Sequence, residues 1–430
     1  MSGRASRREI LKRAANLATA GALAFDRTRA ALAREQSGQR RDAAGKIDAL
    51  LRTAVDTGDL PGVVAMAADD AGLVYEGAFG WRRLANSEAM TRDTVFRVAS
   101  MIKPITTVAA MQLVERGKLL LDAPVPPIEP ALAAPQVLDG FDTRGRPLLR
   151  PPKRPILLRE LLTHTSGFAY RLWDAKAARY FKALELIPAK ERKNAPLKPL
   201  MFDPGERWQY GGGLNFVGRL VEFVSGEPLD VYFRKHIFEP LGMHDTAFVI
   251  SAAQQAREAS EHRRQPDGSL MAEPRERIIA HRQFSGGGGI YSTAADYLTF
   301  IRMLLSGGAH YGSRILRPET VALMGRNQIG KLDAGRLRTT APQLSNDVDF
   351  FPGITLKWGY GHMINMQPVP ERRSAGSLTW GGLFNTYYWI DPQKRIAAVF
   401  LTQVLPFADE RALGVYAQFE RAIYAAATAG

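Results

Sequence analysis

Short, mostly apolar runs bounded by turn residues occur near both ends of the chain, whereas in other segments the apolar residues recur every three or four positions. Near the start, two such short runs predict paired strands, Val63–Ala68 and Val74–Gly80, around a turn at 69–72. The two kinds of spacing predict the remaining elements. They are helices at 43–58, Ile105–Arg116, Leu214–Ser225, Leu229–Phe238, Ala294–Leu305 and Glu410–Ala427, and strands at Gly359–Asn365, Gly376–Trp380, Asn385–Ile390 and Ile396–Leu401.

The order of these elements predicts an α/β fold in one domain, 34–430. Strands at both ends of the chain favour one antiparallel sheet that the two ends complete together, flanked by the terminal helices. The α/β part is expected at about 43–122 and 285–430, with an all-α lobe inserted at about 123–284. The proline-rich stretch 123–155 within that lobe is expected to be an irregular crossing.

The composition of the 430 residues is globular, with 46% hydrophobic and 23% charged residues. The chain has no cysteine, which excludes disulfides, a thiol nucleophile and thiolate zinc sites. Its seven histidines are isolated in sequence, so we expect no metal and no cofactor. The formal charge is +14, but no helix-turn-helix, finger or ribonucleoprotein motif accompanies it. We therefore expect a scattered basic surface and no nucleic-acid partner.

The N-terminus resembles a twin-arginine export signal. Arg7 and Arg8 precede a mildly apolar stretch, Ala14–Phe25, and a small-x-small sequence ends at Ala33. Residues 1–33 are therefore expected to be cleaved near Ala33, which implies a bacterial source and a periplasmic location. The alternative is an ordinary basic amphipathic helix. The apolar stretch is too short to span a membrane, so the mature chain is expected to have no stable membrane anchor.

Ser100 and Lys103 are the most informative residues. They lie three residues apart where a helix is expected to start near Ser100, with Pro104 in its first turn, so their side chains are expected on one face. A serine hydroxyl becomes a nucleophile only beside a base, and lysine can be that base when burial or a neighbouring charge lowers its pKa. The alternative is a polar helix start, with Ser100 as a cap and Lys103 in solvent.

Two other segments are candidates for chemistry. His164 is a candidate base, but we favour a hydrogen-bonded structural histidine at a helix end. The run Gly286–Gly289 lacks the Gly-Lys-Ser/Thr ending of a phosphate loop, which indicates a tight backbone passage instead. No Gly-x-Ser-x-Gly sequence occurs, which argues against an α/β-hydrolase nucleophile elbow.

An ordered set of short motifs resembles the serine β-lactamases and penicillin-binding proteins, and most closely the class C-like carboxylesterases of the family VIII type. The resemblance covers about 43–427 and implies a β-lactamase-like α/β fold. Its motifs, in order, are Ser100–Lys103, Leu161–Gly167, Pro204–Tyr210, Gly218–Glu222, Ser225–Gly226, Pro240–Met243, Ser285–Thr293, Trp380–Gly382 and Trp389–Pro392.

By this resemblance, Ser100 is the acylated nucleophile, and Lys103 and Tyr210 share the role of base. Tyr210 would then protonate the leaving alcohol and activate the deacylating water. The oxyanion would be bound by the backbone N–H groups of Ser100 and Leu383, and such donor pairs are among the largest catalytic contributions. The residues expected to bind the substrate are Trp380, Gly381, Gly382 and Tyr170. Further residues that are either pocket walls or core are Trp173 and Tyr387.

Two positions depart from the penicillin-recognising pattern. Those enzymes carry Asn where this chain has Gly212, and a Lys where it has Trp380, so two polar anchors for a β-lactam or peptide are missing. We therefore expect a serine hydrolase that cleaves small carboxylic esters through an acyl-enzyme on Ser100, with a small-molecule ester as its partner. A β-lactamase, a D-aminopeptidase-like amidase, an acyltransferase of this fold and a penicillin-binding sensor without turnover stay open, as does the oligomeric state.

The export signal can be tested by changing Arg7 and Arg8 together to Lys. The precursor should then stay in the cytoplasm, because the arginine pair is the feature that marks this route. A cell-fractionation blot measures the distribution, with Arg4→Lys as the control outside the pair. Unchanged recovery of the Arg7/Arg8 variant from the periplasm would show that the pair is not an export signal.

Overall fold

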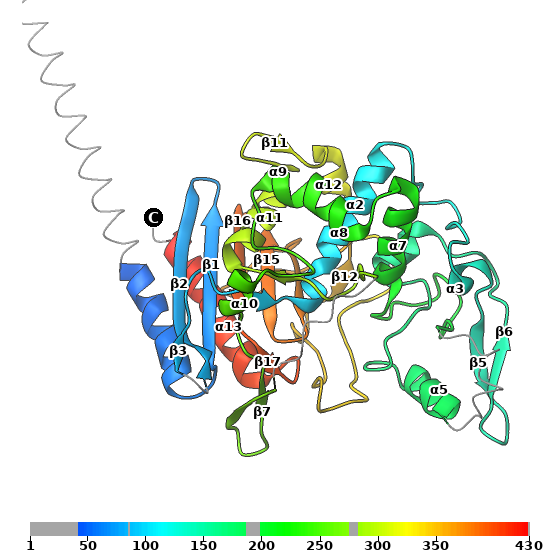
Figure 1. Cartoon of the computed structure of the whole chain (residues 1–430), viewed down its shortest axis with the longest axis horizontal. Coiled ribbons are helices and arrows are strands. Elements are labelled where there is room, and N and C mark those ends of the chain that lie inside the picture. Colours follow the sequence, from blue (N-terminus) through cyan, green and yellow to red (C-terminus); the bar gives the residue numbers. More distant parts are fainter. Residues whose placement is uncertain (1–41, 85–86, 186–197, 275–282, 429–430) are drawn as a thin grey trace, which may run out of the picture.

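Strands from the first and last parts of the described chain lie in one antiparallel sheet (Figure 1), as predicted. The structure is a computed structural model that describes residues 42–84, 87–185, 198–274 and 283–428. The predicted export signal, 1–33, lies outside the described residues. The sheet has the order β12-β13-β14-β15-β16-β1-β2-β3. Its strands are β1 (Gly62–Asp69), β2 (Gly72–Arg83), β3 (Glu88–Ala89), β12 (Leu356–Trp358), β13 (Met363–Asn365), β14 (Leu378–Gly382), β15 (Thr386–Asp391) and β16 (Ile396–Leu401).

Pairing of β1 with β16 joins the N-terminal and C-terminal halves of this sheet. Val64 lies opposite Leu401, and the hydroxyl of Thr402 donates to the carbonyl of Gly62 at 2.9 Å. The predicted strand at Gly359–Asn365 is shorter than expected, because residues before Met363 form a turn, and β12 was not predicted.

Helices cover both faces of the central strands, which is why every residue of β15 and β16 is buried. On one face, the ring centroids of Trp389 and Phe419 lie 5.8 Å apart, so β15 packs on α13 (Glu410–Thr428). On the other face, the ring centroids of Tyr388 and Tyr297 lie 5.4 Å apart, and Tyr297 belongs to α11 (Ala294–Leu305). Side chains on a strand alternate between faces, and continuous burial is therefore the signature of a two-sided core.

The helices follow the predicted spacing closely. The chain is helical from residue 42 to residue 56, and a short 3₁₀ turn at Ala99–Met101 precedes α2 (Ile102–Glu115). A π turn at Arg234–Phe238 continues α8 (Leu229–Phe233), so the predicted helix Leu229–Phe238 is one helical run. The remaining helices are α2 (Ile102–Glu115), α3 (Pro130–Ala133), α4 (Leu158–Thr163), α5 (Ala175–Glu185), α7 (Gly213–Ser225), α8 (Leu229–Phe233), α9 (Glu239–Leu241), α10 (Ala252–Ala256), α11 (Ala294–Leu305), α12 (Pro318–Met324) and α13 (Glu410–Thr428).

The inserted lobe is rich in helices, but the prediction that it is all-α was wrong. It contains the hairpin of β5 (Val137–Phe141) and β6 (Pro147–Arg150), which lies at the edge of the lobe in Figure 1. Asp142 closes the turn by accepting the N–H groups of Arg144 and Arg146, both at 2.8 Å. Such aspartate turns are local, and the surrounding prolines obscured this one in a stretch expected to be irregular.

Three further small sheets lie within the described part of the chain. A second hairpin, β7 (His262–Arg264) with β8 (Leu270–Ala272), is joined in parallel by β17 (Val404–Leu405). The pair β4 (Phe96–Arg97) and β9 (Tyr291–Ser292) brings the chain before Ser100 beside the chain after Gly289. The last pair is β10 (Ala309–His310) with β11 (Ser313–Arg314). Among the described residues, no helix is long and apolar enough to cross a membrane.

Gly211 lets two segments of the inserted lobe touch. A Cβ at this position would lie 1.7 Å from the carbonyl oxygen of Phe168, whereas a Cβ at Gly212 would lie 3.6 Å from its nearest neighbour. Since a backbone carbonyl has little freedom to move, only the first position requires glycine.

Gly211→Ala should therefore destabilise the protein by about 2–3 kcal/mol, the usual cost of forcing an atom into a packed interior. Gly212→Ala is the matched control and should change the free energy of unfolding by less than about 1 kcal/mol. Urea unfolding of both variants measures the difference. Equal stability of the two would contradict the close approach at Gly211.

Candidate active site

Ser100 stands at the junction of a strained turn and a buried helix. Ala99, immediately before it, has φ +44°, a left-handed conformation that costs a non-glycine residue on the order of 1 kcal/mol. The 3₁₀ turn is held by the Met101 N–H donating to the Val98 carbonyl at 3.0 Å. The turn places the serine hydroxyl within reach of the first turn of α2, where Lys103 lies.

The spacing of Ser100 and Lys103 brings their side chains together, as predicted. Lys103 Nζ donates to Ser100 Oγ at 2.9 Å and to the carbonyl of Gly287 at 2.8 Å. The Lys103 side chain is fully buried, so the alternative of a solvated lysine is wrong. Burial lowers the pKa of Lys103 to about 7, because removing an ammonium group from water disfavours its charged form.

Two tyrosine rings flank the amine. Lys103 Nζ lies 4.9 Å from the ring centroid of Tyr210 and 5.4 Å from that of Tyr170. The faces of aromatic rings attract a cation, so these contacts favour a protonated amine and oppose the effect of burial in part. Both the protonated and the neutral form of the amine are therefore accessible near neutral pH.

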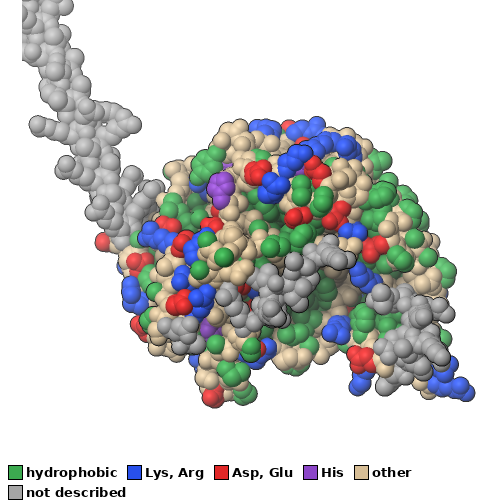
Figure 2. All heavy atoms as spheres, viewed as in Figure 1, with side chains coloured by type: hydrophobic (Ala, Val, Ile, Leu, Met, Phe, Trp, Pro, Cys, Tyr) green, Lys and Arg blue, Asp and Glu red, His purple; other side chains and the backbone are tan. Residues whose placement is uncertain are grey.

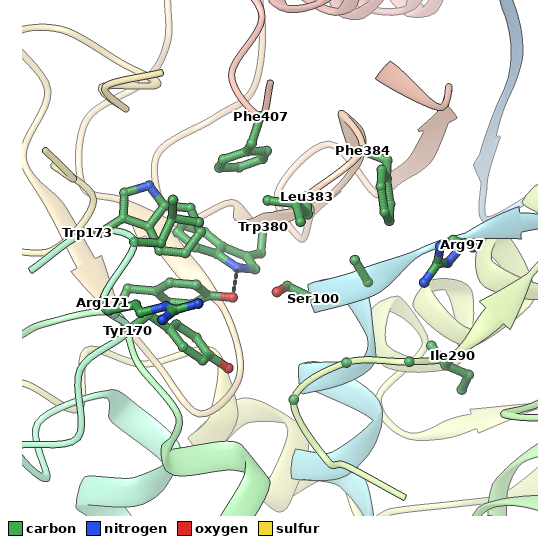
Figure 3. A pocket seen from close by; sticks show the side chains of 17 residues that line it. Arg97, Ser100, Tyr170, Arg171, Trp173, Ile290, Trp380, Leu383, Phe384 and Phe407 are labelled. Atoms are coloured by element: carbon green, nitrogen blue, oxygen red, sulfur yellow. Dashed lines mark hydrogen bonds between the residues drawn. The ribbon is translucent and has the colours of Figure 1, made fainter. Parts of the chain in front are cut away.

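Tyr210 is the third predicted catalytic residue, and it comes from the segment before α7. Its hydroxyl accepts a hydrogen bond from Trp380 Nε1 at 3.0 Å, drawn as a dashed line in Figure 3. Burial raises the pKa of Tyr210 well above its ordinary value, while hydrogen bonds from Ser100 and Trp380 oppose that shift. The phenol is therefore protonated in the resting site, and Lys103 is the group better placed to accept the serine proton.

His164 is a structural residue, as the preferred interpretation held. It caps the C-terminus of α4 in the left-handed conformation, and its Nδ1 accepts the Gly211 N–H at 3.4 Å. Its ring is buried and lies 4.7 Å from the ring of Tyr210, centroid to centroid. Burial, and then the charge of Lys103, lower the pKa of His164 well below its ordinary value. The neutral imidazole therefore packs against the ring of Tyr210.

The end of β14 packs directly on the turn that carries Ser100. A Cβ on Gly382 would lie 2.3 Å from the Val98 carbonyl, so only glycine allows this approach. The next residue, Leu383, lies beside Ser100 in Figure 3, and both line the same cavity. The two residues whose backbone N–H groups are predicted to bind the oxyanion therefore line one cavity.

Ser100 opens into a cavity of about 410 Å³. The predicted residues Tyr170, Trp380 and Gly381 line this cavity, and so does Trp173. Gly382 does not line it and instead packs against the carbonyl of Val98. Tyr387 does not line the cavity; it stacks on Tyr416 in the core. The described residues that line the cavity are Arg97, Ala99, Ser100, Tyr170, Arg171, Leu172, Trp173, Tyr210, Gly287, Gly288, Gly289, Ile290, Trp380, Gly381, Leu383, Phe384 and Phe407.

Several of these walls could not be found from motifs. Leu172, Phe384 and Phe407 are single apolar residues in loops, and no periodicity distinguishes them. The role of Gly287 was also missed, since its contribution is a backbone carbonyl rather than a side chain. Among the described residues, no group of three or more His, Asp or Glu side chains is arranged to hold a metal ion.

Comparisons with known proteins agree over nearly the whole chain. A family model described as Beta-lactamase matches residues 47–422. The chain is 33% identical over 396 residues to a lovastatin esterase from Penicillium rubens, covering 88% of this chain and 98% of that protein. It is 32% identical over 405 residues to a monacolin J acid methylbutanoyltransferase from Aspergillus terreus, covering 88% and 95%. The solved unliganded simvastatin synthase from Aspergillus terreus superposes with a TM-score of 0.77 at 31% identity, covering 90% and 100%.

The lowered pKa of Lys103 predicts the pH dependence of acylation. Below pH 7 the amine is mostly protonated, so the rate should rise about tenfold per pH unit and level off above pH 7. Lys103→Arg keeps a cation that cannot deprotonate and should lower kcat by about 10²–10⁴. Single-turnover rates with a chromogenic ester measure both effects, and Lys118→Arg, on the surface, is the control. A flat profile between pH 5 and pH 8 would exclude Lys103 as the base.

Proposed function

This chain belongs to the β-lactamase family and is a serine hydrolase or acyl-transferring enzyme; on that premise, we propose that it hydrolyses small carboxylic esters. The observation that carries the proposal is the buried Lys103 amine, 2.9 Å from Ser100 Oγ and with a pKa of about 7. A base with a pKa near the working pH is the most effective partner for a serine nucleophile.

Acylation of Ser100 follows from these positions. The neutral amine of Lys103 takes the proton as Ser100 Oγ attacks the ester carbonyl, and the backbone N–H groups of Ser100 and Leu383 bind the developing oxyanion. The phenol of Tyr210 then gives its proton to the leaving alkoxide, and the ammonium of Lys103 replaces that proton. The products of this half-reaction are an alcohol and an acyl-enzyme on Ser100.

Deacylation reverses the same proton path with water in place of the alcohol. Water enters the position of the leaving group and gives its proton to the Tyr210–Lys103 pair as it attacks the acyl carbonyl. Ser100 Oγ leaves and is reprotonated, which restores the resting site. The pair acts as one unit, so its protonation states belong to both residues together.

The polar contacts of the site favour esters over β-lactams. Gly212 presents no amide at the position where penicillin-recognising enzymes carry Asn, and Trp380 places an indole where they carry an ammonium group. The indole N–H of Trp380 is already engaged by the Tyr210 hydroxyl. A β-lactam would therefore leave its amide and carboxylate without these partners.

Acyl transfer to an alcohol is a second candidate, since relatives of nearly the same length are named methylbutanoyltransferases. The cavity walls favour an organic acceptor, because Trp173, Phe384 and Phe407 are all apolar. An alcohol bound there would compete with water for the acyl-enzyme. Hydrolysis and transfer share every step except the identity of this acceptor.

One assay series tests the proposal. p-Nitrophenyl butyrate should be cleaved with a kcat/KM about 10²–10⁴ higher than that of nitrocefin, because each missing polar contact costs about 1–3 kcal/mol. Ser100→Ala should lose both turnover and labelling by a fluorophosphonate. Added 1-butanol distinguishes hydrolysis from acyl transfer, because formation of butyl butyrate in place of butyrate indicates transfer. Equal kcat/KM for the ester and nitrocefin, or a single stoichiometric burst, would exclude an esterase.

A further inference from the structure

A second cavity adjoins the catalytic cavity. Its volume is about 250 Å³, and its apolar walls include Phe168, Met201 and Phe216. Tyr170 and Arg171 line both cavities, so the two cavities adjoin at these residues. The mechanism above assigns no role to this second cavity.

Two cations line the second cavity without a matching acid. The described residues around it include Arg171 and Lys198 but no Asp or Glu. Arg171 makes no ion pair with any described carboxylate, and the Lys198 amine lies 4.8 Å from the ring centroid of Phe216. Arg97 lies on the opposite side of the catalytic cavity in Figure 3. It differs from Arg171 because it is paired with Glu261.

An amide donor adds to this positive lining. Asn215 lines the second cavity, and its Nδ2 lies 3.6 Å from the position that a Gly212 Cβ would occupy. Gly212 also lines this cavity and has no side chain to lie over the amide. Apolar walls, two cations and one amide donor match an organic anion whose carbon chain lies between a reactive group and a carboxylate.

We propose that the second cavity is a subsite for the carboxylate end of an acidic substrate. The carbon chain would pass Tyr170 and lie against Phe168 and Phe216, with the carboxylate between Arg171 and Lys198. The inference rests on the proposed function in treating this anion as part of the ester, and it narrows the substrate class to esters that carry a carboxylate remote from the scissile bond.

Binding without turnover tests the subsite directly. By calorimetry in 50 mM salt, 4-phenylbutyrate should bind the full chain about tenfold more tightly than 4-phenyl-1-butanol, since only the acid pairs with the cations. Lys198→Gln, which alters the second cavity alone, and Arg171→Gln should each remove most of that preference. Arg144→Gln changes an exposed arginine of the β5–β6 turn and should leave the preference intact.

Equal affinity for the acid and the alcohol, or binding of neither, would overturn the subsite. An acid preference that survives Lys198→Gln would place the anion in the catalytic cavity instead and would also overturn it. Hydrolysis of mono-p-nitrophenyl adipate and of p-nitrophenyl hexanoate keeps the two proposals separate. Acid-selective binding without cleavage of either ester would reject the esterase alone, whereas cleavage of both without acid-selective binding would reject the subsite alone.

Discussion

Keeping one lysine out of water is the constraint on which the site depends. Lys103 is fully buried, and its amine has the Ser100 hydroxyl and the Gly287 carbonyl as hydrogen-bond acceptors. A buried ammonium group is costly unless such acceptors or aromatic faces compensate it, and the balance leaves the pKa near neutrality. Exposure of this one side chain would restore an ordinary lysine, protonated at neutral pH and unable to accept the serine proton.

The burial is achieved by segments that lie far apart in the sequence. α2 supplies Lys103, the segment before α7 supplies Tyr210, and the loop at Gly286–Gly289 supplies the carbonyl that faces the amine. This loop must pass close to α7: a Cβ on Gly286 would lie 2.3 Å from the Leu214 carbonyl. The glycines of the site therefore act through close packing of backbone, which a motif records only as a run of small residues.

Local patterns predicted the parts of the protein that local physics determines. The helix at Ala294–Leu305 and the strand at Ile396–Leu401 have the bounds that their spacing indicates, and Ser100 and Lys103 meet because a helical turn aligns them. The β5–β6 hairpin and the cavity wall at Phe407 were missed, because the first depends on one aspartate turn and the second on which loops meet in space. Tyr210 and Leu383 could be assigned only through the family resemblance.

The place of β16 in the sheet governs when the protein can fold. β1 is among the first elements to leave the ribosome, but its partner on one side is β16, and the bond between Thr402 and Gly62 joins residues 340 positions apart. At about 5–20 residues per second, roughly tens of seconds of synthesis separate the two strands. During that time, the edge of β1 that later pairs with β16 has no partner strand, and an open strand edge can pair with other chains. The sheet is completed only after both strands have been synthesised, and this edge of β1 stays open until then.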